Sequence, residues 1–494
     1  MRRVPLLSGT RLVVAAAPDD AVVLRPPPPG RATDADAATR EALRFPLDGP
    51  SLEDRARGAK RATIVVQAPS LPNPHPSGDP RGRAIAAVSR AVEELGVPTS
   101  RQTLLIASGL ARRPSQRDVA ALVPPEFART FHGRVVIHDA SDPALVWLDD
   151  TVGVAPALVE TDLVVVVSAA ETVLHGGPGV LLAGADAGMQ RLATAESLLE
   201  TRGSVGWELA TWLEGAISSR VPLVGVSLVV NHPRTSGSLR GYPYDAATVE
   251  RTASRPFRLA VSATPDGVRR RVLQSLRAER TAAAVLAGPP SVAHAEALLR
   301  GIELRSATLA QPLDALVLAV PGSTAFLPRE APNPLAVAHA ALGHALALWR
   351  DAFPIADGGV VILVDHFRRS FARPTQMPYL AFFGPTPIAR NPELLAEAER
   401  AAATDARAIE EYRAGRTVHP LLPFRDWDAC QPALERLGSV YNAGARDGGT
   451  VRQLGFVPIG GIGGALRMAL GERGPDARIG FLLAPPYFPL KVGA

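Results

Sequence analysis

Short apolar runs alternate along the chain with longer segments in which apolar residues recur at helical spacing. The short runs are rich in Val, Ile and Leu and are bounded by turn-forming residues, a pattern typical of strands buried in parallel sheets. It predicts strands at residues 62–66, 103–106, 134–138, 162–167, 223–230, 257–262, 283–286, 315–320, 360–364 and 479–483. The pattern also predicts amphipathic helices at residues 82–95, 291–300, 334–349 and 392–414. This alternation favours an α/β protein with largely parallel sheets.

The length of the chain and the spacing of these elements predict two domains. A chain of 494 residues is long for a single hydrophobic core. An arginine-rich helix predicted at residues 265–280 lies between two sets of strands. We therefore expect α/β domains at residues 1–280 and 281–494, with a cleft between them. Residues 233–255 are polar and rich in Gly, Pro, Ser, Thr and Arg, so we expect a loop there.

Composition narrows the classes of protein. Hydrophobic residues make up 47% of the chain and charged residues 20%, as in ordinary globular proteins. The basic residues behind the net charge of +5 are scattered, so we expect no nucleic-acid surface. No apolar run approaches the ~20 residues of a membrane span, and Arg11 interrupts the apolar N-terminal stretch that superficially suggests a signal peptide. The single cysteine, Cys430, excludes an internal disulfide and suits a reducing cytoplasm.

Polar residues follow several predicted strands at the point where each strand ends. In parallel α/β sheets, ligands bind at the carboxyl ends of the strands. The sequence therefore predicts that a functional site, if the chain has one, is built from these loops. Their polar residues are Gln67, Ser108, Gly109, His138, Asp139, Glu171, His175, Gly176, Gly177, Asp365 and His366.

Two motifs at neighbouring strand ends resemble a known family. Residues 107–115 read A-S-G-L-A-R-R-P-S, and residues 138–142 read H-D-A-S-D. The pair resembles the nickel-pincer lactate racemases and their relatives, where the motifs read A-T-G-x-H-R-x-x-T and V-x-x-H-D-x-x-D. The matching residues are Gly109, Arg112, His138, Asp139 and Asp142.

The resemblance extends over nearly the whole chain and implies the racemase fold. A glycine-rich loop of the family carries a histidine that matches His175, and Gly176 and Gly177 keep the character of that loop. Later segments, at residues 284–295, 334–344 and 357–362, also resemble the family. The resemblance implies a 2-hydroxy-acid racemase or epimerase that moves hydride to a nickel-pincer nucleotide.

The residues that hold cofactor and substrate in the family are mostly replaced in this chain. In the family, a lysine tethers the pincer covalently, whereas Lys60 and Lys491 are the only lysines here. The predicted helix at residues 189–202 lacks the histidine that ligates nickel in the family. We therefore expect that the chain does not use the family's cofactor. The other replaced positions are Ala68, Leu71, Ala111, Ala341 and His344.

His175 is the strongest candidate for a catalytic base. In the family, two histidines face each other across the substrate, and Ala111 stands at the position of the second. Two-sided chemistry would need a substitute such as His138 or His366. Alternatively, His175 only hydrogen-bonds its glycine-rich loop.

The remaining candidates have structural alternatives. His138 and Asp139 form an oriented imidazole or cap a turn, and Gly176 and Gly177 cradle phosphates or form a tight turn. A metal site from His138, His175 and His366 is the least favoured option. His339 and His344 are five residues apart, the wrong spacing for one face of an α-helix. The other expected cleft residues are Ser108, Gly109, Arg112, Asp139, His344 and His366.

Three hypotheses for function remain open. The replacement of the cofactor and substrate residues favours a paralogue without the family's catalysis. Through the inherited cleft it would bind a small acid such as a hydroxy acid, or a nucleotide-like ligand, or a protein partner. The alternative is a 2-hydroxy-acid racemase or epimerase, an isomerase that uses His175 as a base. The third hypothesis, an enzyme with a rebuilt zinc or nickel site, is the weakest of the three.

Overall fold

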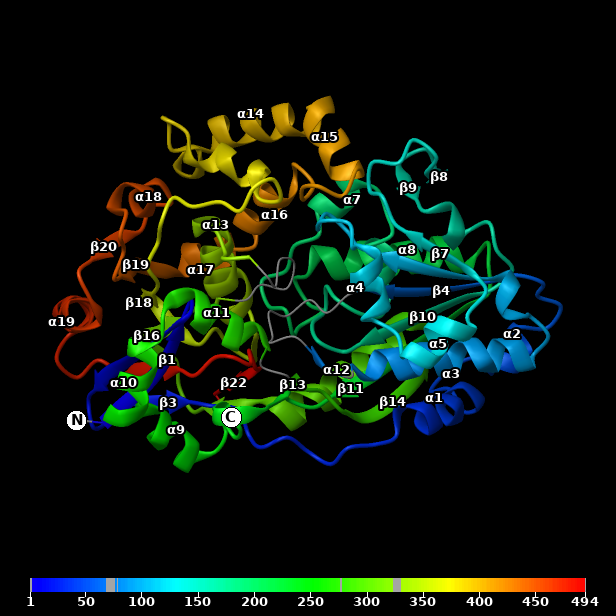
Figure 1. Cartoon of the computed structure of the whole chain (residues 1–494). Helices are drawn as coiled ribbons and strands as arrows, with labels where there is room; N and C mark the ends of the chain where they lie inside the picture. The colour runs from blue at the N-terminus through cyan, green and yellow to red at the C-terminus, as the bar shows by residue number, and fades with distance from the viewer. Residues whose placement is uncertain (1, 68–75, 78, 276–277, 323–329, 494) are drawn as a thin grey trace.

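The computed structural model describes residues 2–67, 76–77, 79–275, 278–322 and 330–493. Two lobes lie side by side, and each is built around a six-stranded sheet with helices packed on it (Figure 1). The predicted α/β class with largely parallel sheets is confirmed. Among the described residues, no helix has the length and apolar character that crossing a membrane requires.

The first lobe contains a sheet whose strand order is β14-β11-β10-β4-β6-β7. All neighbouring strands are parallel except β14, which runs antiparallel to β11. Both faces of the sheet are buried: Ile64 and Val66 pack into one hydrophobic layer and Val65 into the other. The strands are β4 (Ala62–Gln67), β6 (Gln102–Ala107), β7 (Arg134–Ile137), β10 (Val164–Ala169), β11 (Leu223–Val230) and β14 (Ala282–Gly288).

Helices cover both faces of this first sheet. One layer contains α1 (Ala35–Arg44) and α3 (Pro80–Glu94), and the other contains α6 (Pro178–Leu182) and α8 (Val205–Ser218). α12 (Pro290–Arg305) packs against β11 and β14. The carboxyl ends of the parallel strands face the second lobe, so the loops that leave them lie between the lobes.

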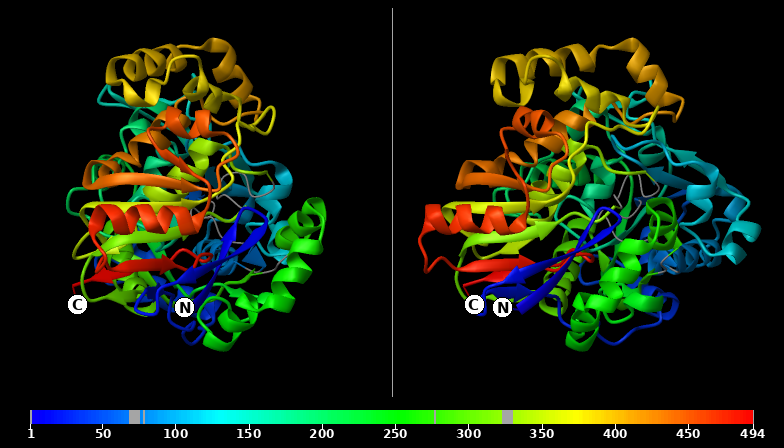
Figure 2. Two further views of the ribbon diagram at one scale, coloured as in Figure 1. Left: turned by 90° about the vertical axis from the view of Figure 1, so that its left-hand side faces the viewer. Right: turned by 60° about the vertical axis from the view of Figure 1, so that its left-hand side comes forward.

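The second lobe contains a fully parallel sheet whose order is β20-β19-β18-β16-β21-β3. One face is covered by α19 (Ile462–Arg473) and by a hairpin of β1 (Arg2–Ser8) and β2 (Arg11–Ala17), which crosses in front of the sheet (Figure 2). The other face adjoins the largest core, which reaches the first lobe. The strands are β3 (Val22–Leu24), β16 (Leu313–Ala319), β18 (Ile355–Val364), β19 (Leu437–Ala443), β20 (Val457–Ile459) and β21 (Ile479–Leu482).

The two sheets exchange strands across the expected domain boundary. β3, near the N-terminus, pairs with β21 in the second lobe. β14, which follows residue 280, pairs with β11 in the first lobe. The division of the chain at residues 1–280 and 281–494 stays a prediction.

The predicted strand at residues 257–262 is wrong, because this segment lies within helix α10 (Arg255–Ala263). Its alternating apolar residues fit a strand, but Ser254 accepts a hydrogen bond from the amide of Phe257 and starts a helix. The predicted loop at residues 233–255 contains α9 (Ala246–Ala253), which is capped by Asp245.

Two predicted helices are shorter than expected. The segment at residues 392–414 forms α14 (Pro392–Ala403) and α15 (Ala406–Arg413), because Asp405 caps a new helix between them. The segment at residues 189–202 contains only the end of α7 (Ala187–Arg191) and then continues without helix.

Candidate functional site

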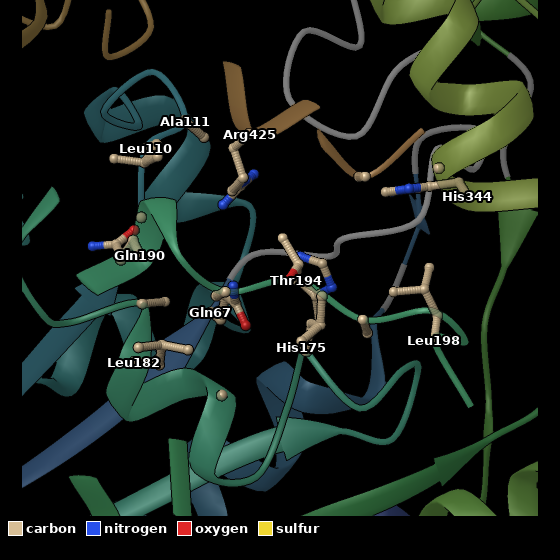
Figure 3. A pocket seen from close by; sticks show the side chains of 18 of the residues that line it. Gln67, Leu110, Ala111, His175, Leu182, Gln190, Thr194, Leu198, His344 and Arg425 are labelled. Carbon is tan, nitrogen blue, oxygen red and sulfur yellow. The ribbon is translucent and has the colours of Figure 1, made fainter. Parts of the chain in front are cut away.

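A cavity of about 70 Å³ lies between the two lobes, and we call it the central cavity. The first lobe supplies Gln67 at the end of β4, Ser108 after β6 and His175 after β10. The second lobe supplies side chains from the helix that begins at Pro334 and from α16 (Leu422–Asp428). Figure 3 shows the side chains of His175, His344 and Arg425 directed toward the same space. Side chains from distant parts of the sequence therefore meet at the carboxyl ends of the strands of the first lobe.

His175 is held by the turn in which it lies. The Thr172 hydroxyl lies 3.0 Å from Nδ1 of His175 and accepts a hydrogen bond of 3.2 Å from its backbone amide. Thr172 thereby fixes the ring orientation and leaves Nε2 free of this turn. His175 is thus both an oriented imidazole in the cavity and a partner of its own loop.

His339 and His344 lie together, and our expectation that they could not share a helix face is wrong. α13 (Pro334–Ala338) continues into a π-helix, η4 (His339–Ala345), in which the amide of Leu346 donates to the carbonyl of Ala341, five residues earlier. Residues five apart are about 140° apart on an α-helix but nearly one turn apart on a π-helix. The two rings are consequently 4.5 Å apart between centroids.

The predicted cleft residue His344 also approaches the first lobe. Its ring centroid lies 6.4 Å from that of His175, at an interplanar angle of 65°. Nδ1 of His344 is buried and has no hydrogen-bond partner among the described residues. An unpaired buried nitrogen carries a desolvation penalty of about 1–3 kcal/mol, which a ligand in the cavity could relieve.

Arg425 is the cation of the central cavity. Its guanidinium is directed into the cavity (Figure 3) and makes no side-chain hydrogen bond to any described residue. Asp426 is its nearest carboxylate, at 4.0 Å from Nη2. A guanidinium with free donors fits the two oxygens of a carboxylate.

A buried hydrogen-bonded network lies behind the histidines. Asp426 accepts a hydrogen bond of 2.5 Å from the Tyr379 hydroxyl, and its other oxygen lies 3.5 Å from Nδ1 of His339. Burial raises the pKa of Asp426 to about 6, although Arg425 acts in the opposite direction. The oxygen of Asp426 that faces His339 has no hydrogen-bond partner among the described residues, so Asp426 contacts His339 without bonding to it.

Burial keeps the histidines of the central cavity neutral. Burial, with smaller contributions from Arg425 and His344, lowers the pKa of His175 to about 3. Burial and Arg425 lower the pKa of His339 to about 3, and burial and His339 lower that of His344 well below its usual value. The cavity therefore presents neutral imidazoles beside one guanidinium near neutral pH.

The structure brings four of the ten predicted site residues into the lining of this cavity: Ser108, Gly109, His175 and His344. Ala111, at the position of the missing histidine, also lines it. Ala68 and Leu71, two of the replaced positions, lie outside the described residues.

Three predicted residues support neighbouring loops. His138 is buried and its Nε2 lies 2.8 Å from the carbonyl of Ala185. Asp139 accepts a hydrogen bond from the amide of Ser141 and pairs with arginines from both lobes. Arg112 pairs with Asp118 at 3.3 Å. Asp139 therefore caps a turn, and none of the three lines the cavity.

Gly176 and Gly177 are explained by close packing against His294 on α12. A Cβ built on Gly176 would lie 2.3 Å from Cε1 of His294, and one on Gly177 would lie 2.3 Å from its Cβ. Both glycines also have positive φ angles, of +112° and +51°. The tight-turn alternative accounts for both residues.

His366 lies in a different cavity, at the carboxyl ends of β16 and β18, which we call the second cavity. His138, His175 and His366 thus lie in three separate surroundings. Across the described part of the chain, no group of three or more His, Cys, Asp or Glu residues is arranged to hold a metal ion.

Arg425 and His339 are the site residues that the sequence interpretation missed. Arg425 lies some 250 residues after His175 in the chain and belongs to no motif. His339 is missed because α-helical spacing does not apply to η4, which is a π-helix. The available signal was the pair of charged residues Arg425 and Asp426 between the apolar residues Phe424 and Trp427 of α16.

The residues of the central cavity do not fit the covalent nickel-pincer nucleotide of the lactate racemases that the sequence resembles. The lining contains no lysine. Lys60 lies before β4, at the strand end away from the cavity, and Lys491 lies 3.8 Å from Glu303. A covalent tether in the manner of the family therefore has no lysine in reach of this cavity.

Comparisons with known proteins agree with this architecture. Residues 9–176 match the lactate racemase N-terminal domain. The structure is similar to the lactate racemase apoprotein from Thermoanaerobacterium thermosaccharolyticum, with a TM-score of 0.61 and 15% identity over 99% of this chain and 100% of that one. It is also similar to a protein from Thermotoga maritima, with a TM-score of 0.51 and 11% identity over 94% of this chain and 100% of that one. No protein of curated function matches the sequence.

Proposed function

We propose that this chain binds a small organic acid in the central cavity without the covalent cofactor of the lactate racemases. Its residues 9–176 match the lactate racemase N-terminal domain, and its fold is similar to that of the lactate racemase apoprotein. The observation that carries the proposal is the partly buried guanidinium of Arg425, which is directed into the cavity and lacks a hydrogen-bonded partner among the described residues. The arginine that holds a carboxylate in the family is replaced by Leu71. Arg425 supplies the same chemistry from the second lobe.

The surroundings of Arg425 suit a hydroxy acid. A carboxylate at Arg425 places the rest of a small ligand beside His175, His344 and Gln67, which line the same space. Neutral imidazoles and an amide offer both donors and acceptors to a hydroxyl group. Apolar side chains such as Leu198 complete the lining, as is usual in small-molecule sites.

The size of the cavity favours a small acid over a nucleotide. One water molecule needs roughly 10–15 Å³ of such space, so 70 Å³ holds about five to seven non-hydrogen atoms. A 2-hydroxy acid of three carbons is close to this size, whereas a nucleotide is several times larger. Among the candidate ligands of the central cavity, we therefore favour the small acid over a nucleotide and over a protein partner.

Racemisation is the second candidate function, and one observation favours it. His175 and His344 approach the cavity from opposite lobes, with ring centroids 6.4 Å apart. His344, rather than His138 or His366, is the residue placed to stand in for the missing second base. However, a general base works best when its pKa is near the working pH, and the pKa of His175 is lowered to about 3.

A bound anion would make the histidines of the central cavity better bases. Burial is the larger cause of the lowered pKa of His175, but Arg425 contributes, and a carboxylate would neutralise that contribution. The pKa values of His175 and His344 should therefore rise when an acid binds. Without a hydride acceptor, this rise supports proton transfer to and from the hydroxyl group and not exchange of the α-hydrogen.

Calorimetric titration with D- and L-lactate and with their deoxy analogue propionate tests the proposal. We expect binding of the hydroxy acids, a loss of about 10–100-fold in affinity in Arg425→Gln, and no change in the control Arg407→Gln, an exposed arginine on α15. Binding that is equally strong in Arg425→Gln would contradict the proposal.

Chiral chromatography separates the two candidates. Incubation of the protein with one lactate enantiomer should leave it unchanged if the chain only binds the acid. Appearance of the other enantiomer, with its loss in His175→Gln and in His344→Gln, would instead establish the racemase alternative.

The remaining expectations on partners and location are part of this proposal. Basic residues are scattered along the sequence, so we infer no nucleic-acid partner. A cytoplasmic location is inferred from the single cysteine, Cys430.

A further inference from the structure

We propose that the second cavity is a binding site for a phosphate group, either as free phosphate or as a monoester. The cavity has a volume of about 190 Å³ and is separate from the central cavity. Its polar lining includes Thr10, Arg11, Arg270, Asp365, His366 and Arg368. The proposal does not depend on the acid-binding function.

The second cavity lies where α/β sheets bind ligands. Gly322 follows β16 and Asp365 follows β18, so the cavity opens at the carboxyl ends of two adjacent parallel strands. The turn of the β1–β2 hairpin closes one side of the cavity. The N–H of Gly9 donates to the carbonyl of Val320, and the carbonyl of Gly9 accepts from the N–H of Gly322. The cavity therefore has a fixed wall beside the strand ends.

Positive charge is in excess around this cavity. Arg11 and Arg368 line it and form no ion pair with any described carboxylate. Asp266 is already paired with Arg269 at 3.1 Å and with Arg270 at 3.6 Å. The arginines also repel one another, because Arg446, Arg269 and Arg368 all lower the pKa of Arg11 after burial.

One guanidinium is oriented by a neutral histidine. Nδ1 of His366 lies 2.8 Å from the carbonyl of Gly444 and must donate to it, so Nε2 accepts from Arg11 at 2.9 Å. This fixes the tautomer of His366 and uses one of the five donors of Arg11. The remaining donors are available to an anion.

Asp365 adds a second feature that points to a ligand. It makes no side-chain hydrogen bond within the described part of the chain, although it lines the cavity. Burial raises the pKa of its carboxyl to about 7. A protonated Asp365 can donate a hydrogen bond to a phosphate oxygen, while its neutral form leaves the arginines uncompensated.

The charge balance favours phosphate over a carboxylate. Arg11 and Arg368 come from separate segments, and both lack an acidic partner among the described residues. A phosphate dianion matches two guanidinium groups, and its oxygens accept their paired donors. A single carboxylate would satisfy only one of the two.

The test is calorimetric titration of the full chain with inorganic phosphate, glycerol phosphate and adenosine monophosphate. We expect millimolar or tighter binding that weakens at least about tenfold in Arg368→Gln and in Arg11→Gln. The control Arg467→Gln, an exposed arginine on α19, should bind as the parent chain does. Tighter binding of a monoester than of phosphate identifies a phosphorylated metabolite, and equal binding identifies free phosphate.

A second readout locates the site. The ring signals of His366 should shift in the NMR spectrum when phosphate is added, while those of His175 should not. Absence of binding by all three probes, or binding that is unchanged in both variants, would overturn the proposal. Because Arg368 is exposed at its position in the loop after β18, its variant should fold even if Arg11→Gln does not.

Discussion

The central cavity and the second cavity both lie at carboxyl ends of parallel strands, yet they hold charge in different ways. In the central cavity, one guanidinium lies among three histidines that burial keeps neutral. In the second cavity, several arginines crowd around carboxylates that are paired or held partly protonated. Strand ends thus determine where a ligand can bind, whereas the degree of burial of the titratable groups determines which ligand fits.

Acid should destabilise the protein mainly through its buried histidines. A histidine whose pKa is lowered on folding contributes its full stability above pH 6.5, and this stability is lost as the pH falls toward the lowered value. Six histidines whose pKa falls to about 3 or 4, together with His344, are opposed by three carboxyls with raised pKa values, whose effect has the opposite sign. The histidines are His138, His175, His232, His294, His339 and His419, and the carboxyls are Glu214, Asp365 and Asp426.

Between pH 7 and pH 5 we expect a loss on the order of 4 kcal/mol in the free energy of unfolding. Urea denaturation at the two pH values measures it. His339→Gln should reduce this pH dependence, whereas His366→Gln in the second cavity should reduce it less, because His366 is only partly buried. A profile that is flat between the two pH values would contradict the charge states described for the central cavity.

Glycine substitutions should separate the two cavities in a second way. Gly177→Ala places a methyl group against His294 at a φ of +51°, and we expect a loss of about 3–4 kcal/mol in the free energy of unfolding. Gly9→Ala, in the hairpin turn of the second cavity, is the matched control: its φ is +56° but nothing lies within 4 Å. Gly9→Ala should lower the free energy of unfolding by only about 1 kcal/mol. Equal losses, measured by urea denaturation, would show that backbone strain outweighs packing.

Binding by the two cavities should be separable by single substitutions. Arg425→Gln should weaken lactate binding by about 10–100-fold and leave phosphate binding unchanged, and Arg368→Gln should do the reverse. Calorimetry with both ligands on both variants measures the four affinities. If either substitution weakens the binding of lactate and of phosphate equally, the two cavities are coupled or one ligand has been assigned to the wrong cavity.

The smallest effect is expected at His138. Its ring bonds to the carbonyl of Ala185 behind the central cavity, so His138→Gln should change the affinity for lactate by less than about twofold. The same substitution should lower the unfolding temperature, because a buried hydrogen bond is altered. A large loss of affinity at unchanged stability would restore His138 as a ligand-contacting residue.

Much of the fold could be predicted from hydrophobic periodicity. Nine of the ten predicted strands overlap strands of the structure, because Val- and Ile-rich runs buried on both faces have few alternatives. The segment at residues 257–262 failed because its alternation fits an exposed helix as well as a strand, and the Ser254 cap decided between them. Local sequence patterns could not predict that β3 pairs with β21 and β14 with β11, because strand exchange between lobes depends on tertiary contacts.

The first-lobe half of the site was largely predicted, whereas in the second lobe only His344 was. Ser108 directly follows β6, and His175 lies in the loop after β10, so their convergence follows from parallel topology. Arg425 reaches the cavity from a short helix of the second lobe, and nothing near it in sequence indicates its neighbours. His366 follows a strand as His175 does, but it belongs to the other sheet, so the same rule placed it in a different cavity.

The π-helix at η4 bears on how such chains should be aligned. Two histidines five residues apart on a π-helix occupy nearly the same relative positions as two histidines four apart on an α-helix. Removal of one residue between His339 and His344 should therefore preserve the pair and convert η4 to α-helix, whereas removal of three, which leaves a spacing of two, should part the rings. A single-residue gap at this point in an aligned relative thus signals a change of helix type, and the histidine pair can persist across it.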